Sequence, residues 1–142
     1  MILLDTNVVS ALALPLPDPA VRRWLDGQTR GALWTTSVTV FELFDGARRL
    51  PDGARRRALE AALIRLLDGP VVGGRVAAVD REAAEAAADL AARRVRAGTP
   101  GGVADTLIAG VALSRGFGVA TRNLRHFADL GAGVAVLDPF AA

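Results

Sequence analysis

Short apolar runs alternate along the chain with longer segments in which apolar residues recur at helical spacing. The runs at 2–4, 32–35, 75–79, 118–121 and 134–137 predict five strands. The longer segments predict helices over 7–14, 20–26, 37–50, 54–68, 81–97, 103–115 and 124–130. Strands that are apolar throughout and alternate with helices are typical of a parallel sheet covered on both faces. The pattern therefore predicts an α/β fold, a three-layer α/β/α sandwich with a central parallel sheet.

The composition fits one globular domain. The chain has 142 residues, 51% of them hydrophobic, which is enough for a single core, so we expect residues 1–142 to form one domain. No apolar run reaches the roughly 18 residues that a membrane-spanning helix needs, so no membrane association is expected. The N-terminus has no basic lead, and Asp5 interrupts its apolar run, which disfavours a secretory signal. The absence of cysteine excludes disulfides and thiolate metal sites, and a cytoplasmic location is expected.

Charge narrows the possible chemistry further. The net charge is only +2, but all 17 basic residues are arginine and none is lysine. Without lysine, the chain cannot form a Walker A phosphate loop or a Schiff base. With His126 as the single histidine, a Ser-His-Asp triad is also disfavoured. Any catalysis must therefore rely on carboxylates, hydroxyls, amides and arginine, whose fork-shaped guanidinium suits phosphate.

Three carboxylates stand out, and each also has a purely structural interpretation. Asp5 follows the first predicted strand and could cap the next helix. Thr39 and Glu42 match the T-x-x-E pattern of a capping box. Asp105 lies in the first turn of a helix that is apolar almost all round, opposite a bulky face that includes Val103. A carboxylate buried there must be paired or bind a metal, although the helix dipole also favours an acid in a first turn.

Ligands of parallel sheets bind outside the carboxyl ends of the strands, and Asp5, Thr121 and Asn123 all follow predicted strands. Thr121 could also simply end its strand, and Asn123 could cap the next helix. Converging carboxylates about 4 Å apart would repel by up to ~4 kcal/mol at an effective dielectric constant of about 20. A cation would relieve this repulsion, and oxygen ligands select Mg²⁺ or Mn²⁺. Such a site can perform phosphodiester chemistry.

The segments LLDTN, TVFEL, ADTLIAGVA and VATRN, in this order, resemble a PIN-domain ribonuclease, most similar to the VapC/FitB-type toxins of toxin–antitoxin pairs. The resemblance implies a Mg²⁺- or Mn²⁺-dependent endoribonuclease that a cognate antitoxin protein neutralises and that is usually a homodimer. It implies that Asp5 and Asp105 are principal metal ligands and that Glu42 is a further ligand or a water-orienting base. Thr121 and Asn123 match the strand end that, in this family, supports the acidic site. Many members have Asp where this chain has Asn123, which favours a single metal.

The same resemblance makes RNA the expected substrate. Six arginines are candidate phosphate contacts: Arg22, Arg23, Arg48, Arg49, Arg122 and Arg125. The early helices, over 20–50, are the candidate dimer surface.

Two other classes of protein fit part of the pattern. One is a non-catalytic PIN-like module that binds RNA or protein without cutting, which the replacement at Asn123 favours. The other is a haloacid-dehalogenase-like phosphatase, which also has Asp after its first strand. Such a phosphatase uses D-x-D and usually a lysine, whereas this chain has Asn7 at the second acidic position and no lysine. A receiver domain is disfavoured for the same reason, because it needs a lysine and an N-terminal pair of acidic residues, and this chain has neither.

Overall fold

The computed structural model describes all residues from 1 to 142, and its core is one parallel five-stranded sheet. The strands are β1 (Ile2–Leu4), β2 (Leu33–Thr36), β3 (Val76–Ala77), β4 (Gly118–Ala120) and β5 (Val136–Leu137). They lie in the order β3-β2-β1-β4-β5, and every neighbouring pair is parallel. All five predicted strands are present, with ends that differ by at most two residues from the predicted ones.

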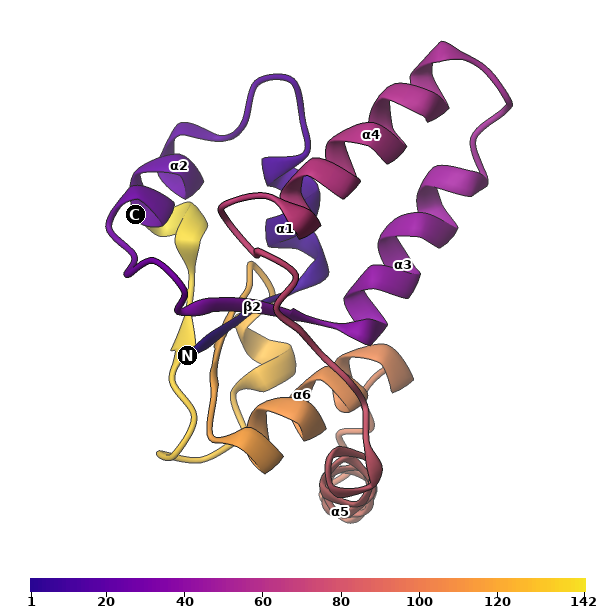
Figure 1. The fold of residues 1–142 in the computed structure, drawn as a ribbon. Helices are drawn as coiled ribbons and strands as arrows, with labels where there is room; N and C mark the ends of the chain where they lie inside the picture. Colours follow the sequence, from indigo (N-terminus) through magenta and orange to yellow (C-terminus); the bar gives the residue numbers. More distant parts are fainter.

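Helices cover both faces of this sheet (Figure 1). They are α1 (Thr6–Leu12), α2 (Pro19–Asp26), α3 (Ser37–Arg48), α4 (Ala54–Asp68), α5 (Arg81–Arg96) and α6 (Val103–Arg115), with short 3-10 helices η1 (Leu124–Phe127) and η2 (Pro139–Ala141). Helices α1 to α4 pack on one face, and α5, α6 and η1 pack on the other. The predicted α/β/α sandwich with a central parallel sheet is therefore confirmed.

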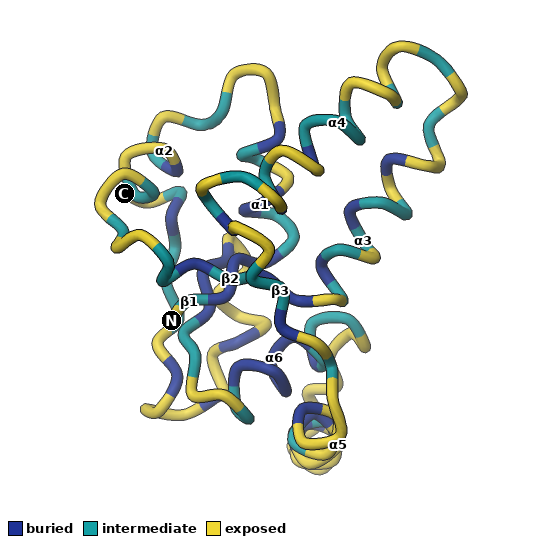
Figure 2. Tube along the Cα trace, viewed as in Figure 1, coloured by how far each residue is buried: buried dark blue, intermediate teal, exposed yellow.

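The two faces of the sheet have separate apolar cores, because successive strand residues point to opposite sides. Leu3 packs with Ile108 and Phe127 in one core, and Leu4 packs with Val8 and Leu63 in the other. Figure 2 shows this buried layer following β1, β2 and the inner side of α6. None of the helices is long and apolar enough to cross a lipid bilayer.

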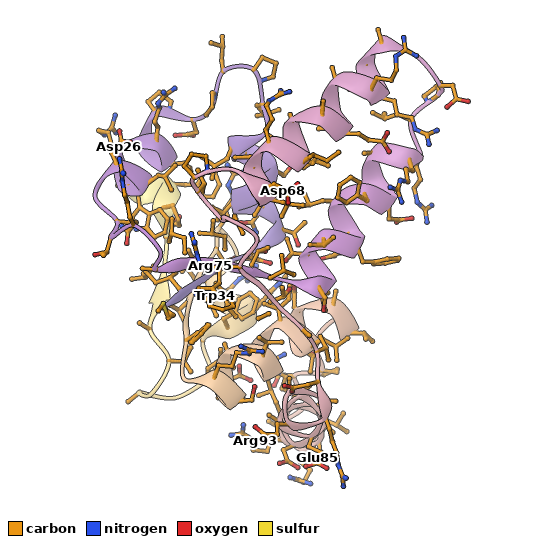
Figure 3. All side chains as sticks on the ribbon, viewed as in Figure 1. Asp26, Trp34, Asp68, Arg75, Glu85 and Arg93 are labelled. Carbon is orange, nitrogen blue, oxygen red and sulfur yellow. The ribbon has the colours of Figure 1, made fainter.

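Helix α6 lies unusually close to α5, and Gly110 makes this approach possible. A Cβ atom at Gly110 would lie 2.4 Å from the carbonyl oxygen of Ala83 and 2.7 Å from the Cβ atom of Ala87. Figure 3 shows Glu85 and Arg93, both exposed, on the outer part of α5, and Trp34 and Arg75 in the middle of the molecule. The close packing of the two helices fixes the start of α6, where Asp105 lies.

The helices predicted over 54–68 and 103–115 have the expected bounds, and those predicted over 20–26, 37–50 and 81–97 differ by one or two residues at one end. The other two predicted helices differ more. The helix predicted over 7–14 begins at Thr6 and ends at Leu12, because Asp5 caps it one residue earlier than expected. The segment predicted as a helix over 124–130 contains only one 3-10 turn, Leu124–Phe127. Both differences lie at the edge of the sheet that carries the candidate site.

Candidate active site

The carboxyl ends of β1 and β4 meet at the centre of the sheet. The chain runs outward through β2 and β3 on one side and through β4 and β5 on the other, so β1 and β4 flank a topological switch point. Such points are the usual ligand crevices of open parallel sheets. Asp5 directly follows β1, and its backbone N–H donates to the carbonyl of Ala120 at the end of β4 (3.0 Å). Asp5 and Thr121 therefore lie side by side at this crevice.

Asp5 is almost completely buried, with 2% of its surface exposed. Its Oδ1 accepts the backbone N–H of Thr6 (2.8 Å), which caps α1. Its Oδ2 accepts the hydroxyl of Thr121 (2.7 Å) and the side-chain amide of Asn7 (3.1 Å). The two interpretations of Asp5, helix cap and site residue, are therefore compatible, since the cap occupies only one direction on Oδ1.

Glu42 is not part of a capping box. Helix α3 begins at Ser37, and its cap is Thr36, whose hydroxyl accepts the backbone N–H of Thr39 (3.1 Å). Glu42 lies a further turn into the helix, where its Oε1 accepts the hydroxyl of Thr6 (2.7 Å). The capping interpretation of Glu42 is wrong, and the observed bond instead ties this carboxylate to the residue next to Asp5.

Asp105 lies in the first turn of α6, with 25% of its side chain exposed. The helix is buried on most sides from Thr106 to Ala112, as expected, but its first turn is not, and Val103 on the predicted bulky face is 77% exposed. One oxygen of the Asp105 carboxylate, Oδ2, contacts Nδ1 of His126 (2.5 Å). The imidazole is carried by η1, which follows β4 in the chain.

Electrostatics connect the three carboxylates. Burial raises the pKa of Asp5 above its usual value, and the negative charges of Asp105 and Glu42 raise it further. The hydrogen bonds from Thr121 and Thr6 act in the opposite direction and favour the ionised form. No arginine forms an ion pair with any of the three carboxylates, and His126 is the only basic side chain that contacts one of them. Arg94 acts on Asp105 at longer range, whereas Asp5 and Glu42 have no ion-pair partner in the protein.

The donor set suits a hard cation, but it does not form a complete cage. No group of three or more Asp, Glu, His or Cys side chains is clustered closely enough to enclose an ion. Asp5 uses three of the roughly four lone-pair directions of its carboxylate, so one direction on Oδ1 is free. Oxygen donors of this kind match Mg²⁺ or Mn²⁺, which keep several water molecules in their coordination shell. Water and substrate oxygens would complete such a shell.

The remaining predicted residues differ in their position. Thr121 is fully buried and supports Asp5 directly. Asn123 is exposed, and only its backbone reaches the site, through an N–H that donates to the hydroxyl of Thr121 (2.9 Å). Sequence reasoning missed Thr6, Asn7 and His126. The first two could have been found, because they directly follow Asp5 in the sequence, but the contact between His126 and Asp105 has no local signal.

The six candidate arginines are also unequal. Arg23 donates to the carbonyl of Ala142, Arg48 and Arg49 form ion pairs with Glu60 and Asp45, and Arg122 stacks on Phe140. Arg22 is exposed on α2, away from the carboxylates. Of these six, only Arg125 lines the same cavity as Asp105 and His126.

The fold and the acidic switch point define an α/β protein of the PIN type, and the comparisons agree. The sequence profile of the PIN domain matches residues 2–133. The chain is 38% identical to VapC ribonuclease Y4jK of Sinorhizobium fredii, over 99% of this chain and 98% of the relative. It is 33% identical to Toxin FitB of Neisseria gonorrhoeae, over 99% of both chains.

Solved structures give the same result. The crystal structure of FitAcB from Neisseria gonorrhoeae superposes with a TM-score of 0.85 at 32% identity and covers all of both chains. A member of the VapBC family of toxin–antitoxin systems from Mycobacterium tuberculosis superposes with a TM-score of 0.69 at 25% identity, over 96% of each chain. The chain belongs to the PIN-domain family, and within it the VapC and FitB toxins are homologous over its full length. This membership replaces the phosphatase and receiver interpretations.

Proposed function

We propose that this protein is a metal-dependent endoribonuclease, the toxin of a toxin–antitoxin pair. The observation that carries the proposal is the buried Asp5, which has no cationic partner and lies within electrostatic range of Glu42 and Asp105 at the switch point of the sheet. A PIN-domain chain with a relative named as a ribonuclease and another named as a toxin supports the RNA substrate and the toxin role.

Asp5 and Asp105, with Glu42 close by, are the residues that would hold Mg²⁺ or Mn²⁺. When bound, the ion would neutralise these carboxylates, polarise a phosphate oxygen and lower the pKa of a coordinated water molecule. The protein's own part is to hold these carboxylates in a fixed orientation. Thr121 and Asn7 donate to Asp5 Oδ2, and His126 holds Asp105 Oδ2.

Glu42 has the geometry of a base that orients water. Its Oε1 is held by the Thr6 hydroxyl, and no protein group bonds to Oε2. That second oxygen is therefore available to accept a proton from a water molecule that attacks a phosphodiester. Thr6 also contacts the hydroxyl of Thr39 (3.2 Å), so a chain of hydroxyls fixes the Glu42 carboxylate relative to Asp5. Such fixed orientation is what general-base catalysis requires.

The proposed partners follow from the same family. A related structure is described as a member of a toxin–antitoxin system, which supports a cognate antitoxin protein that binds and neutralises this chain. The expected homodimer rests on the resemblance to VapC and FitB toxins. Phe41 on α3, 68% exposed, lies within the candidate dimer surface over 20–50, so Phe41→Glu should convert a dimer to a monomer in light scattering.

The test is cleavage of a pool of small RNAs by the purified protein free of antitoxin. The wild-type protein should make discrete cuts with Mg²⁺ or Mn²⁺ and none with EDTA. Asp5→Asn and Asp105→Asn should both lose cleavage while their circular dichroism spectra stay unchanged. Isothermal titration with Mn²⁺ provides a second readout, because both variants should bind the ion more weakly. Metal binding without any RNA cleavage would refute the proposal and indicate a non-catalytic binding module.

A further inference from the structure

A second feature borders the carboxylates, a cavity of about 510 Å³ between the end of α5, the start of α6 and η1. We name it the loop cavity, because the loop over 99–102 forms one of its walls. Asp105 and His126 belong to its lining, so the cavity opens directly beside the candidate active site. Nearly all of its lining residues are polar, charged or glycine. Its volume lies within the range of about 300–1,000 Å³ that is usual for small-ligand sites.

Arg94 builds the wall of the loop cavity. It is 5% exposed, and its guanidinium donates to both oxygens of Asp129 (2.8 Å each). The same group donates to the carbonyl of His126 (2.7 Å) and to the hydroxyl of Thr106 (3.2 Å). One buried side chain of α5 thus fixes both α6 and the segment around η1. These bonds link the three elements that border the cavity, α5, α6 and η1.

The charges in the loop cavity leave one free cation. Arg94 and Asp129 neutralise each other, and Arg94 is bonded to the protein with all of its donor nitrogen atoms. Arg125, on η1, has no hydrogen-bond, ion-pair or stacking partner in the protein, although it is exposed and lines the cavity. An arginine without a partner beside an acidic site is suited to contact a bound phosphate bidentately.

The opposite wall presents backbone rather than side chains. A Cβ atom at Gly101 would lie 2.9 Å from Nη1 of Arg94, so glycine allows the loop to reach the guanidinium. A Cβ atom at Gly102 would meet nothing within 4 Å, and no side chain caps the first turn of α6. The free N–H groups at the start of this 13-residue helix and its dipole add positive potential at the same cavity.

We propose that the loop cavity is a substrate subsite that holds the RNA nucleotide next to the scissile phosphate, with Arg125 contacting the phosphate of that nucleotide. This inference rests on the proposed endoribonuclease function. The cavity contains no Phe, Trp or Tyr, and its one aromatic side chain, His126, already contacts Asp105, so we assign the contact to phosphate rather than to base identity. Arg125 is therefore a residue that positions the chain of the substrate relative to Asp105, and it raises affinity without reading sequence.

The experiment uses a short RNA oligonucleotide that spans a cut mapped in the small-RNA pool. A series of substrates carries one uncharged methylphosphonate linkage at each position flanking the cut. With the wild-type protein, one flanking position should raise KM about tenfold, the size of one lost charge-assisted contact of ~1.4 kcal/mol. Arg125→Ala should raise KM for the natural substrate by the same factor. With the substrate that carries the neutral linkage at the sensitive position, the KM of Arg125→Ala should not rise any further. This non-additivity is the signature of a direct contact.

Matched variants give the controls. Arg125→Lys keeps the charge and should retain most of the affinity. Arg57→Ala removes an exposed, unpaired arginine at the start of α4. The tip of the α3–α4 hairpin, where α4 starts, points away from α5 and α6 (Figure 1), so this variant should leave KM unchanged. The slope of log kcat/KM against log salt should be less steep by about 0.7 in Arg125→Ala, as for one lost contact to single-stranded nucleic acid.

A pair of variants at Gly102 tests the opposite wall. Asp and Asn have the same size and both cap helices well, and the φ angle of Gly102 is −67°, which any residue can adopt. Gly102→Asp adds a negative charge at the cavity, whereas Gly102→Asn does not. Both should melt at or above the wild-type temperature, but KM should rise at least about fivefold more for Gly102→Asp than for Gly102→Asn.

The outcomes separate the two proposals. If the wild-type protein cuts no RNA with Mg²⁺ or Mn²⁺, the endoribonuclease function fails, and the subsite fails with it. If the wild-type protein cuts and Arg125→Ala has the wild-type KM, only the subsite is refuted. The same conclusion follows if the effects of Arg125→Ala and of every neutral linkage simply add, or if the two Gly102 variants have equal KM.

Discussion

The ion pair between Arg94 and Asp129 makes a quantitative prediction about stability. Asp129→Asn removes the negative charge that pairs with the buried guanidinium of Arg94. It also replaces one carboxylate oxygen with an amide NH₂ group, which cannot accept a hydrogen bond from Arg94. A hydrogen bond to a charged group contributes about 1.5–3 kcal/mol. Water can partly replace the lost oxygen, because 46% of the Asp129 side chain is exposed, so we reduce the expected cost to about 1–2 kcal/mol.

Urea unfolding followed by circular dichroism measures this cost. With a denaturant slope of about 2 kcal/mol/M, the midpoint of Asp129→Asn should fall by about 0.5–1 M at pH 7. The control is Asp89→Asn on α5, where the carboxylate is exposed and has no ion-pair partner, and its midpoint should not move. An unchanged midpoint in Asp129→Asn would refute the reasoning that Arg94 depends on this counter-charge.

The pH dependence supplies a second check, with a definite sign. The hydrogen bond from Arg94 lowers the pKa of Asp129 below its usual value. A depressed pKa in the folded state contributes stability that is complete above the unfolded-state pKa, about 3.9, and is lost as the pH falls through the folded-state pKa. The difference in the free energy of unfolding between the wild-type protein and Asp129→Asn should therefore be constant from pH 8 to 5 and shrink below about pH 4. A difference that persists undiminished into strong acid would contradict the electrostatic explanation.

Four further predictions concern packing and the site. Gly110→Ala should lower the free energy of unfolding by about 1–3 kcal/mol in urea, because the clash with Ala83 outweighs the gain of about 1 kcal/mol in helix propensity. Thr121→Val removes the hydroxyl that orients Asp5 and should reduce RNA cleavage about 10- to 100-fold, with a small change in melting temperature. Glu42→Gln should impair cleavage in the same assay but leave thermal stability nearly unchanged. Thr36→Ala should instead cost about 1 kcal/mol of stability, because it removes the cap of α3.

The strands and the layers of the fold were predictable from the sequence, because buried parallel strands are short apolar runs with no competing pattern. Helix interiors were also predictable, but the orientation of a helix was not. The apolar composition of α6 predicted an inward Val103, yet the first turn projects beyond the sheet, and Val103 is exposed while Ile108 and Val111 are fully buried. Periodicity identifies a helix face, but it does not show where the neighbouring elements end.

The contacts that define the site are the part that the sequence does not contain. Glu42 bonds to Thr6 across 36 residues, and Asp105 contacts His126 across 21. The bond between Arg94 and Asp129 spans 35 residues. Such pairs have no period or local signature, since they arise from how α1, α3, α5 and η1 are placed around the sheet. The residue types could be nominated, whereas their partners required the three-dimensional structure.

The outcome at Asp5 and Glu42 shows when a capping interpretation competes with a functional one. A residue that caps the helix directly after a parallel strand must lie at the carboxyl edge of the sheet, where ligands bind. Its two oxygens then point in different directions, and in Asp5 one serves the cap while the other faces Thr121 and Asn7. Capping by Asp5 is therefore compatible with its proposed role as a metal ligand. Glu42 lies more than one turn inside its helix, where the backbone donors are already bonded, so its carboxylate cannot cap the helix and instead bonds to Thr6.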